Sequence, residues 1–334
     1  MSDNGAEDDY NNTHRAFLQA LLARQTITYP DAKPLLAAIQ TAQSPDRPTL
    51  PEDVSQEDFE NYVHTLNAQI SPFDMEIRST LHQTSKDRIY ALVNTTSDAL
   101  TQMATIYTPD ELAFVKRVLD AMFETYNTAR AEVMALTSMQ ALKLAKPSAS
   151  DERRRESTQT AASANAGLTM MQAEKVLALL VEQEWFELSQ KGFYALSPRG
   201  LMELRGWLID TYNDQPPAQN SDDEDEEDEA EHTKIKFCQA CREIVTMGQR
   251  CPELTCNARL HNHCVRNLFR AQANREECPL CKTAWQDAPP VGEKAARHGA
   301  QQRRTTGGST SANGRRRTNE VAEESDAESG AEED

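Results

Sequence analysis

The sequence predicts a helix-rich α+β protein: two tandem helical domains that each end in a β-hairpin, followed by a small domain that binds two zinc ions. Three observations lead to this prediction. Apolar residues recur at helical spacing over two stretches of about a hundred residues, and each stretch ends in short strand-like segments. All seven cysteines fall within the 44 residues from 238 to 281. Acidic runs separate or flank these parts, which indicates linkers and tails.

The first helical domain is expected over residues 13–107. Apolar residues repeat with a period near 3.6 in three successive segments, so three helices are predicted. The helix starts are expected at Thr13, Pro30 and Ser55, where capping or first-turn residues precede the apolar runs. Residues 75–78 then alternate, and residues 89–93 are strand-like, which together predict a hairpin.

Residues 108–212 repeat this pattern with clearer signals. Thr108 and Pro109 begin a helix that is expected to run to residue 126, and a second helix is expected over 129–143. Thr169 and Gln172 form a capping box for a third helix. The remaining expected elements are an unstructured insertion (146–167), a hairpin with a glycine turn (185–196) and a closing helix (197 to about 211).

Three helices followed by a hairpin is the pattern of a winged helix, so both domains are predicted to have this fold. Winged helices often bind DNA, but the fold alone does not imply it. The helix before the second hairpin, residues 169–184, carries one lysine and three glutamates. A helix that reads the major groove needs outward Arg, Lys, Asn or Gln. Docking to a protein is therefore favoured over sequence-specific DNA reading, and a weak DNA contact remains open.

The zinc prediction rests on eight residues with the spacing C-x2-C-x9-C-x4-C-x4-H-x2-C-x13-C-x2-C. Zinc prefers four sulfur or nitrogen donors, and a C-x2-C turn places two sulfurs on one ion. In the favoured, interleaved arrangement, zinc 1 is held by Cys238, Cys241, His261 and Cys264, and zinc 2 by Cys251, Cys256, Cys278 and Cys281. A sequential arrangement also fits. His263 could replace His261, but the H-x2-C separation favours His261.

Interleaving is the cross-brace of RING and PHD modules, so residues 236–287 are predicted to form a cross-braced double-zinc RING-like domain, a RING or PHD variant. An odd cysteine count and the lack of a signal-peptide pattern argue against disulfides. With four protein ligands per ion, neither site has a vacant position for water or substrate. The two zinc ions are therefore expected to be structural, and metal-ion hydrolysis is not expected.

The net charge of −18 belongs mainly to segments outside the expected domains. Residues 222–231 hold nine acids, the last fifteen residues eight and residues 3–9 four, so the folded body is near neutral. The expected unfolded segments are an acidic tail (1–12), an acidic linker (213–235) and a charged tail (288–334). No apolar run is long enough to span a bilayer, so a soluble intracellular protein is expected.

The two winged helices, the linker and the zinc domain together resemble non-SMC element 1, the RING-type subunit of the SMC-five/six complex. The resemblance covers about residues 13–287. It is most specific in Arg88–Asn94, Ala173–Leu177, Cys256–His261, Cys278–Cys281 and Trp285. One departure is the four residues between the third and fourth ligands, where the family usually has two.

The resemblance implies a nuclear, chromatin-associated subunit acting in DNA repair by homologous recombination and in chromosome maintenance. It also implies ubiquitin-ligase activity, and pairing of the winged helices with a MAGE-type partner besides other subunits of the complex.

A RING ligase holds a ubiquitin-loaded conjugating enzyme and catalyses transfer by proximity and orientation. Its docking surface usually combines an apolar residue near the first ligand pair with a proline near the last pair, and a cation often follows the final ligand. The expected docking residues are Ile244, Val245, Pro279, Leu280 and Lys282.

Two other hypotheses for the function of the zinc domain stay open: a PHD-like reader of histone tails, and a purely architectural module. A reader of methylated lysine needs an aromatic cage. Glu276 occupies the position, two residues before the seventh ligand, where PHD fingers commonly carry an aromatic. This substitution argues against the reader.

Overall fold

The computed structural model describes residues 10–96, 103, 106–147, 167–213, 233–273 and 275–297. The expected N-terminal acidic tail up to residue 9, most of the insertion and the chain after 297 lie outside these ranges. Within them, every helix is too short or too polar to cross a membrane. The described residues form three parts, named here the first unit (10–96), the second unit (106–213) and the zinc module (233–297).

The first unit packs three helices against a three-stranded antiparallel sheet of order β1-β3-β2. Its elements are α1 (Asn12–Arg24), β1 (Thr26–Thr28), α2 (Tyr29–Gln43), η1 (Pro51–Asp53), α3 (Gln56–Ile70), η2 (Ser71–Phe73), β2 (Met75–Leu81) and β3 (Arg88–Asn94). The register places Ile77 opposite Leu92. The core contains the fully buried side chains of Phe17, Leu21, Leu36, Phe59 and Leu66.

Local capping explains where these helices begin. The Ser55 hydroxyl accepts a bond from the Asp58 amide at 3.1 Å, at the start expected for α3. Asn11 caps α1 two residues before the expected helix start at Thr13, and Thr28 caps α2 just ahead of Pro30. β1 was not expected. Its three residues are too few to show a periodic pattern, and they are extended because they pair with β3.

The second unit repeats the order helix, strand, helix, helix, hairpin, with strand order β4-β6-β5. Its elements are α5 (Pro109–Asp120), the π-helical turn η3 (Ala121–Thr125), β4 (Leu136–Thr137), α6 (Ser138–Lys143), α8 (Met170–Glu182), β5 (Phe186–Leu188), β6 (Phe193–Leu196), α9 (Pro198–Glu203) and α10 (Arg205–Tyr212). Both units therefore share one topology. The capping box expected at Thr169 is present, and the cap expected at Thr108 is part of a capping box with Glu111.

The prediction of a helix over residues 129–143 is wrong for the first half of that range. Only Ser138–Lys143 is helical, and residues 127–135 form an irregular loop with Met134 at φ 44°. The cause is tertiary, because backbone carbonyls in this loop accept hydrogen bonds from the zinc module instead of from a helical turn. Residues 127–135 are called the clamp loop below.

The zinc module contains β7 (Gly248–Arg250), β8 (Arg259–Leu260), α12 (Asn262–Ala271) and β9 (Pro290–Val291), in a sheet of order β8-β7-β9. The tail expected to begin at residue 288 therefore begins later, since Val291 pairs with Gly248. The linker expected over 213–235 is also shorter. The Ile235 amide donates to the Asn213 side chain at 2.8 Å, and Ile235 is buried.

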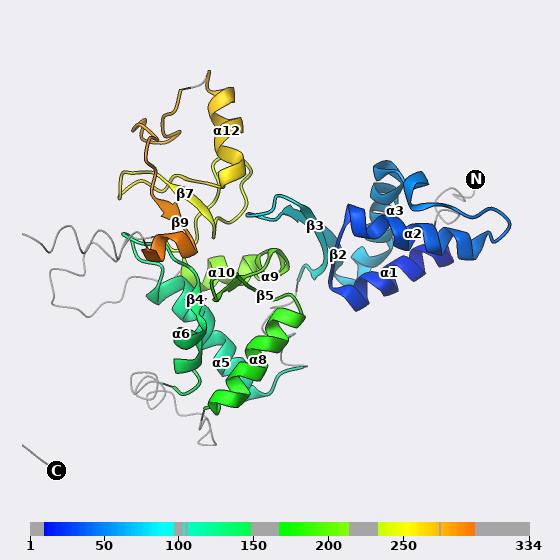
Figure 1. Cartoon of the computed structure of the whole chain (residues 1–334), viewed down its shortest axis with the longest axis horizontal. Helices are drawn as coiled ribbons and strands as arrows, with labels where there is room; N and C mark the ends of the chain where they lie inside the picture. Colours follow the sequence, from blue (N-terminus) through cyan, green and yellow to red (C-terminus); the bar gives the residue numbers. More distant parts are fainter. Residues whose placement is uncertain are drawn as a thin grey trace, which may run out of the picture.

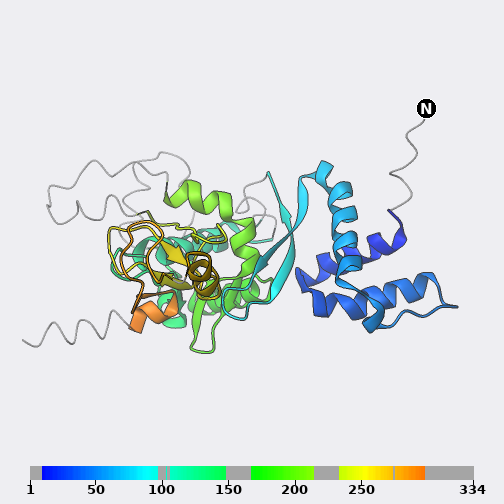
Figure 2. The ribbon, with the colours of Figure 1, turned by 90° about the horizontal axis from the view of Figure 1, so that it is seen from above.

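The three parts pack against one another (Figures 1 and 2). The zinc module lies over the second unit, and a single cluster of buried side chains runs from Phe114 in α5 to Trp285 beside the last zinc ligands. The first unit extends away, but its β2–β3 hairpin reaches back toward both other parts. α9 packs on this hairpin, where Met202 meets Ala91 and Val93.

Candidate metal centres and their attachment

The structure gathers the eight expected ligands into two groups that interleave along the chain. Cys238, Cys241, His261 and Cys264 form site 1, and Cys251, Cys256, Cys278 and Cys281 form site 2. Within each group all ligand atoms lie within 4.8 Å of one another. Three thiols with an imidazole, and four thiols, are donor sets that tetrahedral zinc prefers. The residues therefore fit two zinc ions, and the sequential arrangement is not the one that the structure brings together.

The two C-x2-C turns have the same backbone geometry. The Arg242 amide donates to the Cys238 carbonyl at 3.0 Å, and the Lys282 amide donates to the Cys278 carbonyl at 3.1 Å. Each turn ends in a left-handed residue, Arg242 at φ 64° and Lys282 at φ 66°. This repeated turn presents two sulfurs to one point in each site, as the spacing predicts.

The imidazole of His261 is oriented from both sides. Its Nδ1 lies 3.2 Å from the Cys241 sulfur, while Nε2–H donates to the Ile244 carbonyl at 3.1 Å. A metal-bound histidine usually has such an acceptor on its other nitrogen, which fixes the ring and its tautomer. His263 stacks on His261 with ring centroids 5.1 Å apart and is not part of the ligand group.

Burial of the thiols opposes their ionisation. Desolvation raises the pKa of Cys256, and it raises the pKa of Cys264 to about 11. These two thiols would therefore stay protonated at neutral pH without a metal ion, which must displace their protons when it binds. Zinc can do this because it stabilises the thiolate form directly. Hydrogen bonding with Thr283 instead lowers the pKa of Cys281 to about 6.

The expected docking residues fall into two classes. Ile244 and Val245 are buried, at 3% and 1% exposure, so the expectation that they contact a conjugating enzyme is wrong. Their side chains join the common core beneath the first C-x2-C turn. Leu280 is 53% exposed, Lys282 is exposed and Pro279 is half-buried. The Lys282 ammonium donates to the Pro279 carbonyl at 3.1 Å, so these three residues form one outer surface on site 2.

The described aromatic residues of the zinc module are engaged in packing. Phe269 and Trp285 are buried and meet edge to face at 6.1 Å, and the Trp285 indole donates to Gln249. The Phe237 ring lies under the guanidinium of Arg205 at 5.3 Å. None of the three is arranged as an open cage for a methylated lysine.

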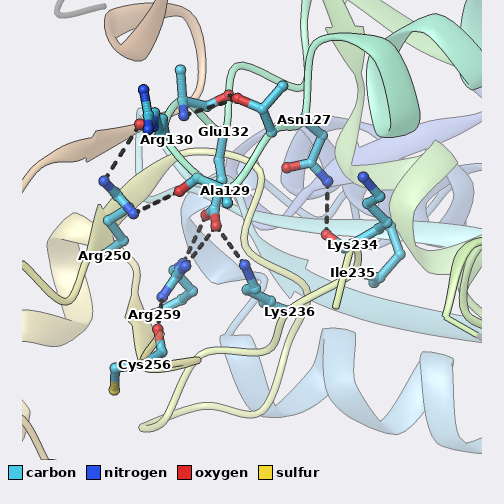
Figure 3. A network of polar contacts seen from close by, with 12 residues as sticks. Asn127, Ala129, Arg130, Glu132, Lys234, Ile235, Lys236, Arg250, Cys256 and Arg259 are labelled. Atoms are coloured by element: carbon cyan, nitrogen blue, oxygen red, sulfur yellow. Dashed lines mark hydrogen bonds and ion pairs between the residues drawn. The ribbon is translucent and has the colours of Figure 1, made fainter. Parts of the chain in front are cut away.

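The attachment of the zinc module to the second unit is a feature that the sequence did not reveal (Figure 3). Glu132 of the clamp loop is 2% exposed, and its carboxylate accepts hydrogen bonds from Arg259 Nε at 2.7 Å and Arg259 Nη2 at 2.5 Å. The Lys236 ammonium donates to the same carboxylate at 2.5 Å. Arg259 also donates to the carbonyl of the zinc ligand Cys256 at 2.8 Å. A buried carboxylate of one part thus holds two buried cations of the other.

Backbone contacts surround this ion cluster. Arg250 donates to the carbonyl of Ala129, the Gly292 amide donates to the carbonyl of Glu132, and Asn127 donates to that of Lys234. Buried backbone groups are rarely left unpaired, so these bonds require the clamp loop and the zinc module to fold against one another. The sequence carries no specific signal for these contacts, because Glu132 falls in a segment that was expected to be helical.

Comparison with known proteins agrees with this architecture. The family model described as "Nse1 non-SMC component of SMC5-6 complex" matches residues 14–204, more than half of the chain. The chain belongs to the Nse1 family. A second model, described as a RING-like domain, matches residues 238–281 and spans all eight ligands of the two sites.

Named members of the Nse1 family align over most of their length. "Non-structural maintenance of chromosomes element 1 homolog" of Homo sapiens is 23% identical over 274 residues, covering 82% of this chain and 84% of the relative. The Schizosaccharomyces pombe relative, "Non-structural maintenance of chromosomes element 1", is 24% identical over 233 residues, covering 70% and 79%. A chain in a solved "Nse1-Nse3-Nse4 complex" has the same fold, with a TM-score of 0.58, 22% identity and coverage of 83% and 97%.

Proposed function

We propose that this chain is a RING-type E3 ubiquitin-protein ligase subunit of the SMC5-6 complex, acting in the nucleus in DNA repair by homologous recombination and in chromosome maintenance. The observation that carries the ligase proposal is the cross-braced module with Pro279, Leu280 and Lys282 on its outer surface. Such a module needs no acid–base residue, because it accelerates transfer by holding the loaded conjugating enzyme in a reactive orientation.

The role of Lys282 follows from its place after the last ligand. Its left-handed backbone and its bond to the Pro279 carbonyl hold the ammonium above the second C-x2-C turn. There it would meet ubiquitin and the conjugating enzyme together. Lysine supplies charge without the bidentate fork of arginine, so we propose weak activity that depends on the partner subunit.

We further propose that both helical units are winged-helix domains that dock a MAGE-type subunit. The shared order of elements and the shared strand order support the fold. The solved relative is a chain of a complex with Nse3 and Nse4, which supports docking. The exposed side of α8 presents Met170, Met171 and Glu174, a surface poorly suited to phosphates. A direct DNA contact should therefore be weak and salt-sensitive in fluorescence anisotropy with duplex DNA.

Ubiquitin-chain formation by the full chain, purified with its partner subunit, tests the ligase proposal. Leu280→Glu is expected to lower the rate at least about tenfold, because a charge would replace a central apolar contact. Lys282→Ala is expected to lower the rate several-fold and Lys282→Arg to preserve it, since arginine retains the charge. Cys251→Ser should abolish activity by opening site 2.

Lys294→Ala is the matched control, because Lys294 is exposed in the zinc module and lies outside both ligand groups and outside the surface of Pro279, Leu280 and Lys282. It should leave the rate unchanged. Wild-type rates for both Leu280→Glu and Lys282→Ala would contradict the ligase proposal and leave an architectural module. Saturable binding of a modified histone peptide would instead favour the alternative function, a PHD-like reader of histone tails.

A further inference from the structure

The tip of the β2–β3 hairpin, residues 82–87, is held by hydrogen bonds within the tip and by a contact with the second unit. The His82 amide donates to the Asp87 carbonyl at 2.8 Å, and the amides of Thr84 and Ser85 both donate to His82 Nδ1 at 3.2 Å. His82 Nε2 in turn pairs with the Glu187 carboxylate at 3.0 Å, on β5. The tip is therefore fixed in shape and anchored to the second unit.

Gln83 extends from this tip into the loop of residues 244–247 in the zinc module. Its Nε2 donates to the Ile244 carbonyl at 3.0 Å. Its Oε1 accepts from the amides of Met247 at 2.8 Å and Thr246 at 3.1 Å. One side-chain amide thus pairs with three backbone groups, much as a neighbouring strand would. Thr246 is buried, so its amide would be costly to leave unpaired.

The Ile244 carbonyl is shared between Gln83 and a zinc ligand. It accepts from Gln83 Nε2 at 3.0 Å and from His261 Nε2 at 3.1 Å. Whatever fixes this carbonyl also fixes the imidazole whose Nδ1 faces the sulfur of Cys241. Partners of this kind usually change metal affinity by about 10- to 100-fold when they are removed.

We propose that Gln83 of the first unit is a positioning residue for zinc site 1, acting through the Ile244 carbonyl on His261. The N-terminal unit thereby completes a metal centre that lies about 160 residues further along the chain. The proposal is specific to site 1. Among the described residues, the polar contacts that leave the hairpin tip reach the 244–247 loop and Glu187, whereas the Cys256 carbonyl of site 2 is held by Arg259.

Cobalt(II) substitution in the full chain can separate the two sites. A centre with three thiolates and an imidazole absorbs visible light differently from one with four thiolates, so chelator competition can be followed at each site. Gln83→Ala is expected to weaken cobalt at site 1 by about 10- to 100-fold and to leave site 2 within about twofold. Zinc release to a chromogenic chelator should show one accelerated phase.

Gln83→Glu distinguishes positioning from simple attachment. Its carboxylate can still accept from the amides of Thr246 and Met247 but cannot donate to Ile244. It is therefore expected to weaken site 1 as Gln83→Ala does. Thr84→Ala, which removes only a contact with the Met247 sulfur, is the control and should change neither site. Unchanged hydrogen exchange in α1 and α3 would verify folding of the first unit.

Equal losses at both sites in Gln83→Ala would overturn the proposal, because they would indicate general loosening of the module. Wild-type affinity at site 1 in Gln83→Ala would overturn it as well. Wild-type affinity in Gln83→Glu together with a loss in Gln83→Ala would assign Gln83 to docking alone.

Discussion

Replacing Glu132 by alanine is expected to destabilise the docked zinc module by about 3–5 kcal/mol, because the change leaves two buried cations without their counter-charge. Arg259 is 1% exposed and Lys236 is 5% exposed, so neither can recover its hydration without opening the interface. Burial lowers the pKa of Lys236 to about 8 in spite of the neighbouring Glu132 carboxylate.

Hydrogen exchange at the Gly292 amide measures this effect, because that amide donates to the backbone carbonyl of Glu132. Its protection should fall by roughly a hundred- to several-thousand-fold in Glu132→Ala. Glu243→Ala is the matched control at the same interface. The Glu243–Arg205 pair spans 2.7 Å but is 47% and 36% exposed, so its loss should cost about 0–1 kcal/mol. Similar losses of protection in the two variants would contradict the proposed importance of the buried Glu132 carboxylate.

The same carboxylate predicts an acid dependence. Burial alone would raise the pKa of Glu132, but hydrogen bonds and charge from Arg259 and Lys236 outweigh burial and lower the pKa to about 2. The depressed pKa means that this stabilisation is fully present above about pH 4.5 and is lost as the pH falls toward 2. The difference in unfolding free energy between the wild type and Glu132→Gln should therefore shrink as the pH falls from about 5 toward 2. A constant difference down to pH 3 would count against the pair.

Zinc removal is expected to have the largest effect on the chain. Apparent binding free energies of structural zinc, about 10–16 kcal/mol, match or exceed the whole stability of a typical domain. A chelator should therefore remove protection from residues 235–291. Because the clamp loop and the hairpin tip bond to this module, their amides should lose protection too, whereas α1, α3 and α8 should keep most of theirs.

Hydrogen exchange with mass spectrometry, before and after chelation, tests this expectation. Adding zinc back should restore protection, which serves as the control for irreversible damage. Unchanged protection of residues 248–269 after complete metal loss would show that the module folds without zinc and would contradict the account.

The parts predicted from the sequence are those that local chemistry determines. The ligand spacing indicates which residues can share an ion. The helix starts at Ser55, Thr108 and Thr169 depend on side chains within the first turn. β1, β4 and β9 have two or three residues each, too few for a periodic signal, and exist because partner strands lie beside them.

Long-range contacts explain the remaining differences. Glu132 and Arg259 are 127 residues apart, and no local pattern in the sequence links them. Ile244 and Val245 follow the first C-x2-C turn as docking residues would, but the packed second unit and hairpin tip bury them. Gln83 is a polar residue in a turn, and only the folded chain shows that it reaches the loop beside His261.

The central claim is that the chain holds one zinc ion in each of two interleaved sites. Native mass spectrometry of the full chain tests it most directly. The wild type is expected to have the mass of the polypeptide plus two zinc ions, and either His261→Ala or Cys278→Ser is expected to carry one zinc ion fewer. A wild-type protein that is folded and carries one zinc ion or none would contradict the claim.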